Sequence, residues 1–144
     1  SDAQNKLRKS DVSKYSRILL TDSNDEISTK ISKAKSDSLK MPTSSDELSD
    51  RPEINNLITI YSSISNIDKE SVINLFSDKE ISFFKSELKD IVISLVEPIA
   101  SNINEIKSDI SYLKTTLEDG AMQATERARK TIDEVNKLMG FSID

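Results

Sequence analysis

The side chains best suited to chemistry lie near the start of the chain, in the run Lys6-Leu7-Arg8-Lys9-Ser10-Asp11. Two ammonium groups three residues apart, followed by a hydroxyl, can bind oxygens that carry negative charge. The chain has no histidine and no cysteine, which removes the commonest general base and any thiol nucleophile. Taken alone, a K-x-x-K-S pattern in a lysine-rich chain is typical of a solvated surface loop.

The next residues along the chain make this run more specific. They are Ser16-Arg17-Ile18-Leu19-Leu20-Thr21-Asp22-Ser23, then Ile27, Lys30-Ile31, Lys33-Ala34 and Ser36-Asp37-Ser38. This order resembles the KMSKS loop of class I aminoacyl-tRNA synthetases and the region after it, and it is most similar to bacterial and organellar tryptophan–tRNA ligases. Their pattern is K-M-S-K-S-D, then S-x-I-x-L-T-D-S, then I-x-x-K-I-x-K-A-x-T-D. The resemblance continues, in order and at the family's spacing, at Arg51-Pro52-Glu53, Asn56-Leu57, Ile60-Tyr61, Pro98-Ile99, Gly120-Ala121 and Gly140.

The resemblance implies an enzyme that activates tryptophan with ATP, releases pyrophosphate and attaches tryptophan to tRNA(Trp) for protein synthesis. Lys6 and Lys9 take the positions of the family's two catalytic lysines, and Ser10 takes that of its final serine. The run from Lys6 to Ser10 is then expected to bind the phosphates of ATP, which enters as its Mg²⁺ complex. The resemblance implies no protein-bound metal.

Two positions of the run depart from the family pattern. Leu7 replaces methionine, which is a mild apolar exchange. Arg8 replaces serine, so a hydroxyl is lost and a bulky, permanently charged group is gained. Arg8 either adds a phosphate contact or points to solvent, and the sequence does not choose between the two.

The other signature of class I synthetases, an H-I-G-H-like sequence, is excluded because the chain has no histidine. If the resemblance holds, the Rossmann-type nucleotide-binding domain and most of the tryptophan pocket lie upstream. The chain is then a C-terminal fragment, which we expect to be inactive alone. Family members are homodimers, but their dimer contacts are expected mainly in the absent domain, so a monomeric fragment is compatible with the family.

The resemblance also implies a tRNA-binding site in the C-terminal helices. The candidate side chains are polar or cationic: Gln123, Arg127, Arg129, Lys130 and Lys137. Phosphate contacts would supply affinity, and one or two polar groups would supply specificity. The alternative is that these are ordinary exposed helix charges, because Lys130 and Glu134 are spaced for an i,i+4 ion pair.

Composition limits the class of protein. At 144 residues, with 35% hydrophobic and 31% charged residues, the chain can form one domain with a core. The net charge of −5 is unusual for a dedicated nucleic-acid binder, so any RNA contact must be local. No segment has the length of a membrane span and no signal peptide is visible. We therefore expect a soluble protein of the bacterial cytoplasm, with an organelle as the alternative.

The first part of the chain predicts loops around one helix. Residues 1–17 are polar and cationic, which predicts a flexible loop, and residues 18–20 are an apolar run too short for a helix. Ser23 and Glu26 have the form of a capping box, which predicts a helix over residues 24–35.

The middle of the chain predicts two further helices. Residues 36–51 are rich in serine and aspartate, which is typical of an acidic surface loop. Pro52 suits the first turn of a helix, and a 3.6-residue apolar period extends this helix over residues 52–65. Asp68 suits the N-cap of a short helix that ends near Ser77.

The strongest apolar periodicity lies in the next stretch. Its residues step by three and four through Phe84, Leu88, Ile91, Val92, Leu95, Ile99, Ile103 and Ile106. The stripe keeps its phase through Pro98, which predicts one kinked helix, with a break at Glu97 as the alternative. A short helix over 109–118 is expected to end at Gly120. A last helix over 121–139, with Ala121, Ala124 and Ala128 inside, is expected to end at Gly140.

These elements predict an all-α fold. We expect a helical bundle that forms the C-terminal domain of a class I synthetase, preceded by a flexible loop that belongs to an absent Rossmann-type domain. Residues 1–22 would be the catalytic loop and its junction, and residues 23–144 the tRNA anticodon-binding domain.

Two alternatives to this function stay open: a relative of tyrosine–tRNA ligases, or a non-enzymatic helical interaction module with an accidental K-x-x-K-S. The T-D-S, P-E, N-L and I-Y matches favour tryptophan. We interpret Asp22 and Asp37 as capping or turn residues rather than catalytic ones. Tyr61 and Tyr112 are expected to be half-buried core residues.

Overall fold

The computed structural model describes residues 13–141, and this part of the chain contains helices and no β-strand. The predicted all-α fold is therefore confirmed. The chain divides into two units, residues 1–101 and residues 102–144, and the boundary falls inside the helix α4 (Ile81–Ser108).

The first helix, α1 (Asn24–Ser32), begins with the predicted capping box. The Ser23 hydroxyl accepts the Glu26 N–H at 3.3 Å, and the Glu26 carboxylate accepts the Ser23 N–H at 2.9 Å. The helix ends three residues earlier than expected. Beyond its end, the Lys85 ammonium donates to the Ala34 carbonyl at 2.7 Å, and burial lowers the pKa of Lys85.

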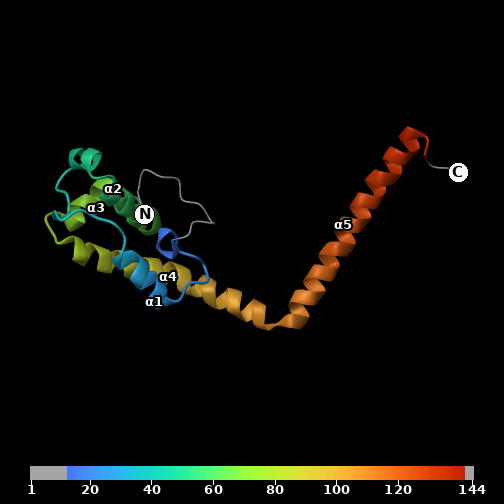
Figure 1. Ribbon diagram of the computed structural model, residues 1–144, viewed down its shortest axis with the longest axis horizontal. Helices are drawn as coiled ribbons and strands as arrows, with labels where there is room; N and C mark the ends of the chain where they lie inside the picture. Colours follow the sequence, from blue (N-terminus) through green and yellow to red (C-terminus); the bar gives the residue numbers. More distant parts are fainter. Residues whose placement is uncertain (1–12, 142–144) are drawn as a thin grey trace. The chain divides into compact units, whose positions relative to one another are not determined.

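The next two helices have nearly the predicted bounds. Helix α2 (Pro52–Ser65) starts on its proline and is followed by Asn66 in the left-handed conformation, with φ of 55°. Helix α3 (Lys69–Phe76) is capped by Asp68, whose carboxylate accepts the Ser71 N–H at 2.8 Å. Figure 1 shows α2 and α3 side by side, near the first part of α4.

The core of the first unit is built from α1, α2, α3 and the first half of α4. Three rings from different helices meet in it: Phe76 lies 5.1 Å from Tyr61 and 4.9 Å from Phe84, centroid to centroid, both in T-shaped contacts. Aliphatic side chains surround them, among them Ile27, Ile54, Ile58, Val72, Ile73, Leu88 and Val92. The expected core position of Tyr61 is confirmed, because only 8% of it is exposed.

The segment before α2 differs from the predicted surface loop. Met41 is 2% exposed, and its N–H donates to the Lys79 carbonyl at 2.9 Å. Leu48 is also buried, on the 3-10 helix η2 (Ser45–Asp50), which packs against α2 and α3. These apolar side chains therefore anchor the segment to the core, although serine and aspartate dominate its composition.

Helix α4 continues through Pro98, so the prediction of one helix rather than two is confirmed. Its apolar stripe is buried only in the first half. Beyond Val96 the stripe becomes exposed: 37% of Ile99 and 45% of Ile106 are accessible to solvent. Periodicity correctly predicted the helix, but it did not show where the core of the first unit ends.

The last helix corrects the sequence prediction. Helix α5 (Ile110–Met139) is one helix and not two, and Gly120 lies inside it rather than capping a shorter helix. Gly140, with φ of +73°, ends α5 as predicted, and the Phe141 N–H donates to the Asn136 carbonyl at 2.8 Å. Glycine costs a helix about 1 kcal/mol relative to alanine, which 30 continuous residues tolerate.

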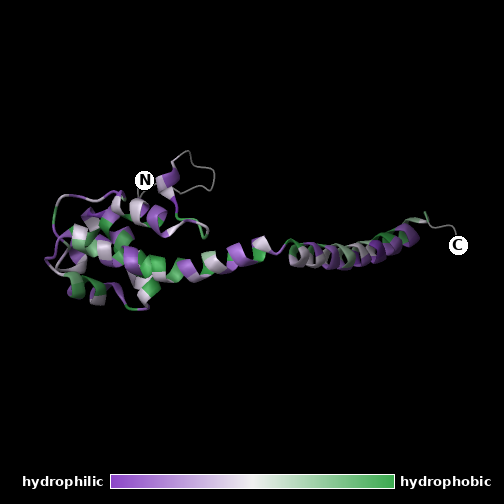
Figure 2. Ribbon diagram, turned by 90° about the horizontal axis from the view of Figure 1, so that it is seen from below, coloured by the Kyte–Doolittle hydropathy of each residue, from purple (hydrophilic) through white to green (hydrophobic). Residues whose placement is uncertain are grey.

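No residue of α5 is buried in the described part of the chain. Tyr112, expected in the core, is 55% exposed, and the three alanines expected on an inner face are exposed too. Figure 2 shows apolar and polar residues interspersed along this helix.

Candidate functional site

The lysine run from Lys6 to Ser10 lies outside the described residues. The described part of the chain opens with residues 13–22, which we call the junction segment. This segment leads directly into α1.

The junction segment begins with a short 3-10 helix, η1 (Lys14–Ser16), where sequence analysis predicted a flexible loop. The Ser13 hydroxyl accepts the Tyr15 N–H at 3.3 Å, and the Ser16 hydroxyl donates to the Ser13 carbonyl at 2.8 Å. Ser16 is only 5% exposed. Serines close this turn by bonding to the backbone, as they do at helix starts.

The end of the junction segment is fixed by Asp22. Its carboxylate accepts the Leu19 N–H at 2.7 Å and also pairs with the Lys30 ammonium of α1. The side chains of Asp22 and Lys30 are 5% and 10% exposed. The interpretation of Asp22 as a turn residue is confirmed, but the lysine beside it was not predicted.

A second contact joins the start of the junction segment to α1. The Lys33 ammonium donates to the Tyr15 hydroxyl at 3.0 Å and lies 4.5 Å from the centroid of the Tyr15 ring. The hydrogen bond from Lys33 lowers the pKa of Tyr15. Lys30 lies in the last turn of α1 and Lys33 is the C-cap residue of this helix, so the C-terminal end of α1 holds both ends of the segment.

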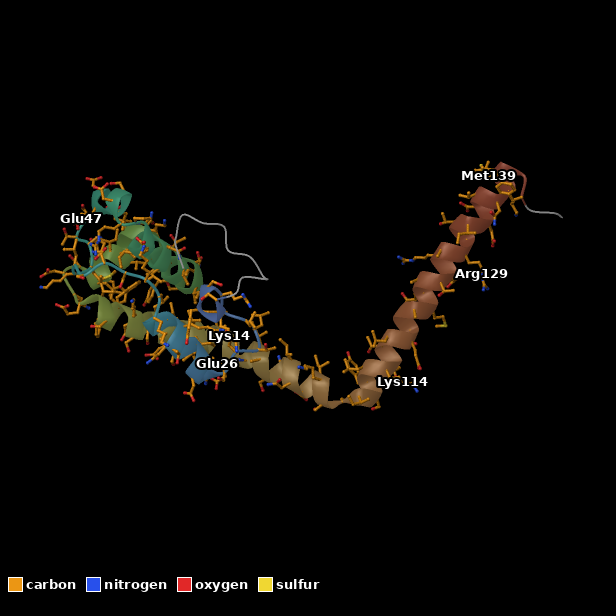
Figure 3. All side chains as sticks on the ribbon, in the orientation of Figure 1. Lys14, Glu26, Glu47, Lys114, Arg129 and Met139 are labelled. Atoms are coloured by element: carbon orange, nitrogen blue, oxygen red, sulfur yellow. The ribbon has the colours of Figure 1, made fainter. Side chains whose placement is uncertain are left out.

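A groove of about 240 Å³ lies between the junction segment and the helices. It is lined by Tyr15, Ser16, Arg17 and Ile18, and across from them by Lys30, Ile31, Ala34, Asn56, Leu57, Ile60, Leu88 and Val92. On the neighbouring surface, Lys14 and Glu26 line a second groove, and both are labelled in Figure 3. The junction thus combines an apolar floor with cationic side chains.

Asp37 has a structural role, as predicted for a turn residue. Its carboxylate accepts the Leu39 N–H at 3.0 Å and two hydrogen bonds, of 2.7 and 2.8 Å, from Arg51. Arg51 is 8% exposed and donates further to the Lys40 carbonyl at 2.8 Å. The hydrogen bonds from Arg51 are the main cause that lowers the pKa of Asp37.

The candidate tRNA-binding side chains all lie on α5, and all are exposed. At 3.6 residues per turn, Gln123, Arg127, Lys130 and Lys137 fall within about 80° of one another around the helix. Arg129, labelled in Figure 3, points about 120° away from the middle of this group. We call the group of four the polar face of α5.

Carboxylates lie close to these cations. A shallow groove along α5 is lined by Arg129, Lys130 and Lys137, and also by Glu126, Asp133 and Glu134. The helix is therefore mixed in charge. Any selectivity for a polyanion must come from the arrangement of the cations, because α5 has no net excess of them.

Sequence reasoning missed the residues that fix the junction segment, namely Tyr15, Lys30 and Lys33. One signal was available. Lys30 comes three residues after the buried Ile27, which places it at the edge of the apolar stripe rather than opposite to it. No pattern in the sequence could have paired Lys33 with an exposed tyrosine 18 residues away.

The chain matches curated proteins along almost its whole length. It is 39% identical over 140 residues to the tryptophan–tRNA ligase of Rhizobium meliloti and 42% identical over 142 residues to that of Rickettsia felis. The Brucella melitensis tryptophan–tRNA ligase is 36% identical over 140 residues. The resemblance to tryptophan–tRNA ligases is confirmed. No protein-family model matches the chain.

These matches cover 97–99% of this chain but only 39–42% of each tryptophan–tRNA ligase. The chain therefore spans about two fifths of the length of the curated relatives it matches. Within residues 13–141, no cluster of three or more Asp or Glu side chains is arranged to hold a metal ion. No helix in this described range is long and apolar enough to cross a membrane.

Proposed function

We propose that the chain is the C-terminal part of a tryptophan–tRNA ligase, an enzyme that activates tryptophan with ATP and attaches it to tRNA(Trp). The observation that carries this proposal is 36–42% identity to proteins of that name over nearly all of the chain. The nucleotide-binding domain and most of the tryptophan pocket belong, in this proposal, to a preceding part of the protein.

In this proposal Lys6 and Lys9 stabilise the phosphates of ATP, which binds as its Mg²⁺ complex, and the pyrophosphate that leaves. The carboxylate of tryptophan attacks the α-phosphate while negative charge accumulates on the phosphate oxygens. Fixed ammonium groups lower the energy of that state more than they strengthen ground-state binding. Leu7, Arg8 and Ser10 complete the ATP-binding run. The polar face of α5, with Arg129 beside it, is proposed to contact tRNA.

The experiment that tests the proposal is Lys9→Ala in the complete protein. We expect tryptophan-dependent ATP–pyrophosphate exchange to slow by about 10²- to 10³-fold, the usual cost of removing one transition-state charge contact. The KM for tryptophan should change by less than about twofold, because the lysine acts on phosphate and not on the amino acid.

Lys114→Ala is the matched control, because Lys114 is an exposed lysine of α5 outside the catalytic run, paired with Glu118 at 3.8 Å. It should exchange at the wild-type rate. If Lys9→Ala also exchanges at that rate, the catalytic role of the run is wrong. Charging of tRNA with tyrosine instead of tryptophan would favour the tyrosine–tRNA ligase alternative, and no charging with either would favour an interaction module.

A further inference from the structure

A pocket of about 360 Å³ lies between the end of α1 and the first turns of α4, two helices that lie side by side in the first unit (Figure 1). We propose that this pocket, which we call the serine–lysine pocket, binds a phosphate group, either free or in the backbone of RNA. The inference goes beyond the proposed function and does not depend on it. The pocket is lined by Ser32, Ser36, Ile81, Ser82, Lys85, Ser86 and Lys89.

The lining of the serine–lysine pocket is purely cationic. Among the described residues that line it, two are lysines and none is a carboxylate. Lys85 and Lys89 are four residues apart on α4 and so share one face of this helix. Glu87 and Asp90 lie about 160° and 140° from Lys85 around the same helix. The pocket therefore favours an anion, unlike the groove along α5, whose lining mixes cations with carboxylates.

Lys85 is a partly buried cation whose hydrogen-bond partners are neutral. Its ammonium donates to the Ala34 carbonyl at 2.7 Å and to the Ser36 hydroxyl at 2.9 Å. Burial lowers the pKa of Lys85, because hydration is lost and no carboxylate of the described residues replaces it. An ammonium group has three hydrogens, so one remains for a further acceptor. An anion in the pocket would accept this hydrogen and supply the missing opposite charge.

Lys89 brings a second ammonium group to the same pocket. Among the described residues it pairs with its sequence neighbour Asp90, at 3.3 Å. The two side chains are 31% and 63% exposed, and an ion pair this open to water contributes little. Lys89 can therefore bind a further anion at small cost.

The serine hydroxyls supply uncharged donors around the two lysines. In the described part of the chain, the Ser82 and Ser86 hydroxyls make no hydrogen bond, whereas Ser63 and Ser94 donate to the carbonyl four residues earlier in their helices. Hydroxyl and ammonium donors together suit the several oxygens of a phosphate. A water molecule occupies about 30 Å³ in the liquid, so this pocket holds a phosphate group and several waters.

The first test titrates the isotope-labelled 144-residue chain, which contains the whole pocket, with inorganic phosphate at an ionic strength held constant with sodium chloride. We expect the amide resonances of Ser82 and Ser86 to shift and saturate, with a Kd on the order of 1 mM. Lys89→Met should weaken this binding by about fivefold, because it removes a charged donor but leaves the hydrogen bonds of Lys85 in place. The matched control is Lys107→Met, an exposed lysine of α4 outside the pocket, which should bind phosphate as the wild type does.

The second test asks whether the phosphate belongs to RNA. Binding of a tRNA(Trp) transcript to the complete protein is measured at several salt concentrations for the wild type, Lys89→Met and Lys107→Met. If an RNA phosphate occupies the pocket, Lys89→Met should weaken binding about three- to tenfold and reduce the dependence of log K on log salt by about 1. Lys107→Met should change neither value. Phosphate binding in the first test with unchanged tRNA binding in the second identifies a free phosphate as the ligand.

Two results would overturn the proposal. In the first, phosphate shifts Ser82 and Ser86 no more than chloride does, and Lys89→Met binds tRNA as the wild type does. Lys85 then serves only to close the end of α1. In the second, phosphate shifts the amides near all exposed lysines equally, which shows charge screening and no site. Neither result depends on Lys9→Ala, so the phosphate site and the proposed catalytic role can fail independently.

Discussion

Arg51 makes several polar contacts with the segment before α2. Its guanidinium binds both oxygens of Asp37 and the Lys40 carbonyl, and it lies 3.8 Å from the Glu47 carboxylate. Arg51 is 8% exposed, so its removal leaves the Asp37 carboxylate and the Lys40 carbonyl without this hydrogen-bond donor at a partly buried site. It thus links the segment before α2 to the start of that helix.

Arg51→Met should lower the free energy of unfolding at neutral pH by about 2 kcal/mol, between the values typical of surface and buried pairs. The folded pKa of Asp37 lies below its ordinary value of 3.8. The stability that the Asp37–Arg51 pair contributes is therefore present above pH 3.8 and is lost as the pH falls through the folded pKa. The difference between wild type and variant should therefore shrink below pH 3.8. Urea unfolding of both proteins at several pH values measures this difference in the free energy of unfolding.

Lys40→Met is the control for this measurement. Its ammonium pairs with Asp78 at 3.2 Å, but the two side chains are 52% and 73% exposed. Exposed pairs contribute about 0–1 kcal/mol, so this variant should unfold nearly as the wild type does. A pH-independent loss in Arg51→Met would show that packing, and not the ion pair, explains its effect.

At the scale of the element, α5 offers the clearest contrast between two sets of charges. Gln123, Arg127, Lys130 and Lys137 share the polar face, whereas Lys114, which is outside the proposed tRNA-binding set, lies on the opposite side of the helix. All five side chains are exposed, so their replacement should not disturb packing within the described chain. One helix therefore supplies both the test residues and their control.

We expect Lys130→Glu in the complete protein to raise the KM for tRNA by about tenfold, because it replaces a phosphate contact with repulsion. Lys114→Glu changes the charge equally on the opposite side of the helix, outside the proposed tRNA-binding set, and should raise this KM much less. Aminoacylation kinetics at two salt concentrations measure both effects. Equal losses in the two variants would assign the effect to net charge, and no loss in either would remove α5 from tRNA binding.

Sequence patterns predicted a helix end best where a local chemical signal marks it. Pro52 begins α2, the Ser23–Glu26 capping box begins α1, and Gly140 ends α5. Gly120 misled the prediction, because a glycine ends a helix only if the chain turns left-handed there, and its neighbours favour helix. Local signals of this kind depend only on residues within one turn.

Contacts between distant side chains were beyond such patterns. The Met41 N–H bonds to the carbonyl of the distant Lys79, and the Tyr15 hydroxyl accepts a hydrogen bond from Lys33, 18 residues away. The proposed roles of the lysine run and of α5 came from the resemblance, while the contacts of Lys30 and Lys33 with the junction segment required the structure.

At the scale of the whole molecule, the chain spans about two fifths of the relatives it matches, and it contains no histidine for a second class I signature. We expect the 144-residue chain alone to show no tryptophan-dependent ATP–pyrophosphate exchange. Exchange measured with the purified chain, beside the complete protein as a positive control, tests this. Measurable exchange would overturn the assignment of the tryptophan pocket to a preceding domain.

The placement of the tyrosines has an optical consequence. The chain has no tryptophan and three tyrosines, so its own near-ultraviolet fluorescence comes from tyrosine alone. Each tyrosine has a different environment: Tyr15 lies under an ammonium group, Tyr61 is packed against two phenylalanine rings, and Tyr112 is largely in water on α5. Replacing one tyrosine at a time by phenylalanine would therefore assign the emission of the junction segment, the core and the last helix, without any added label.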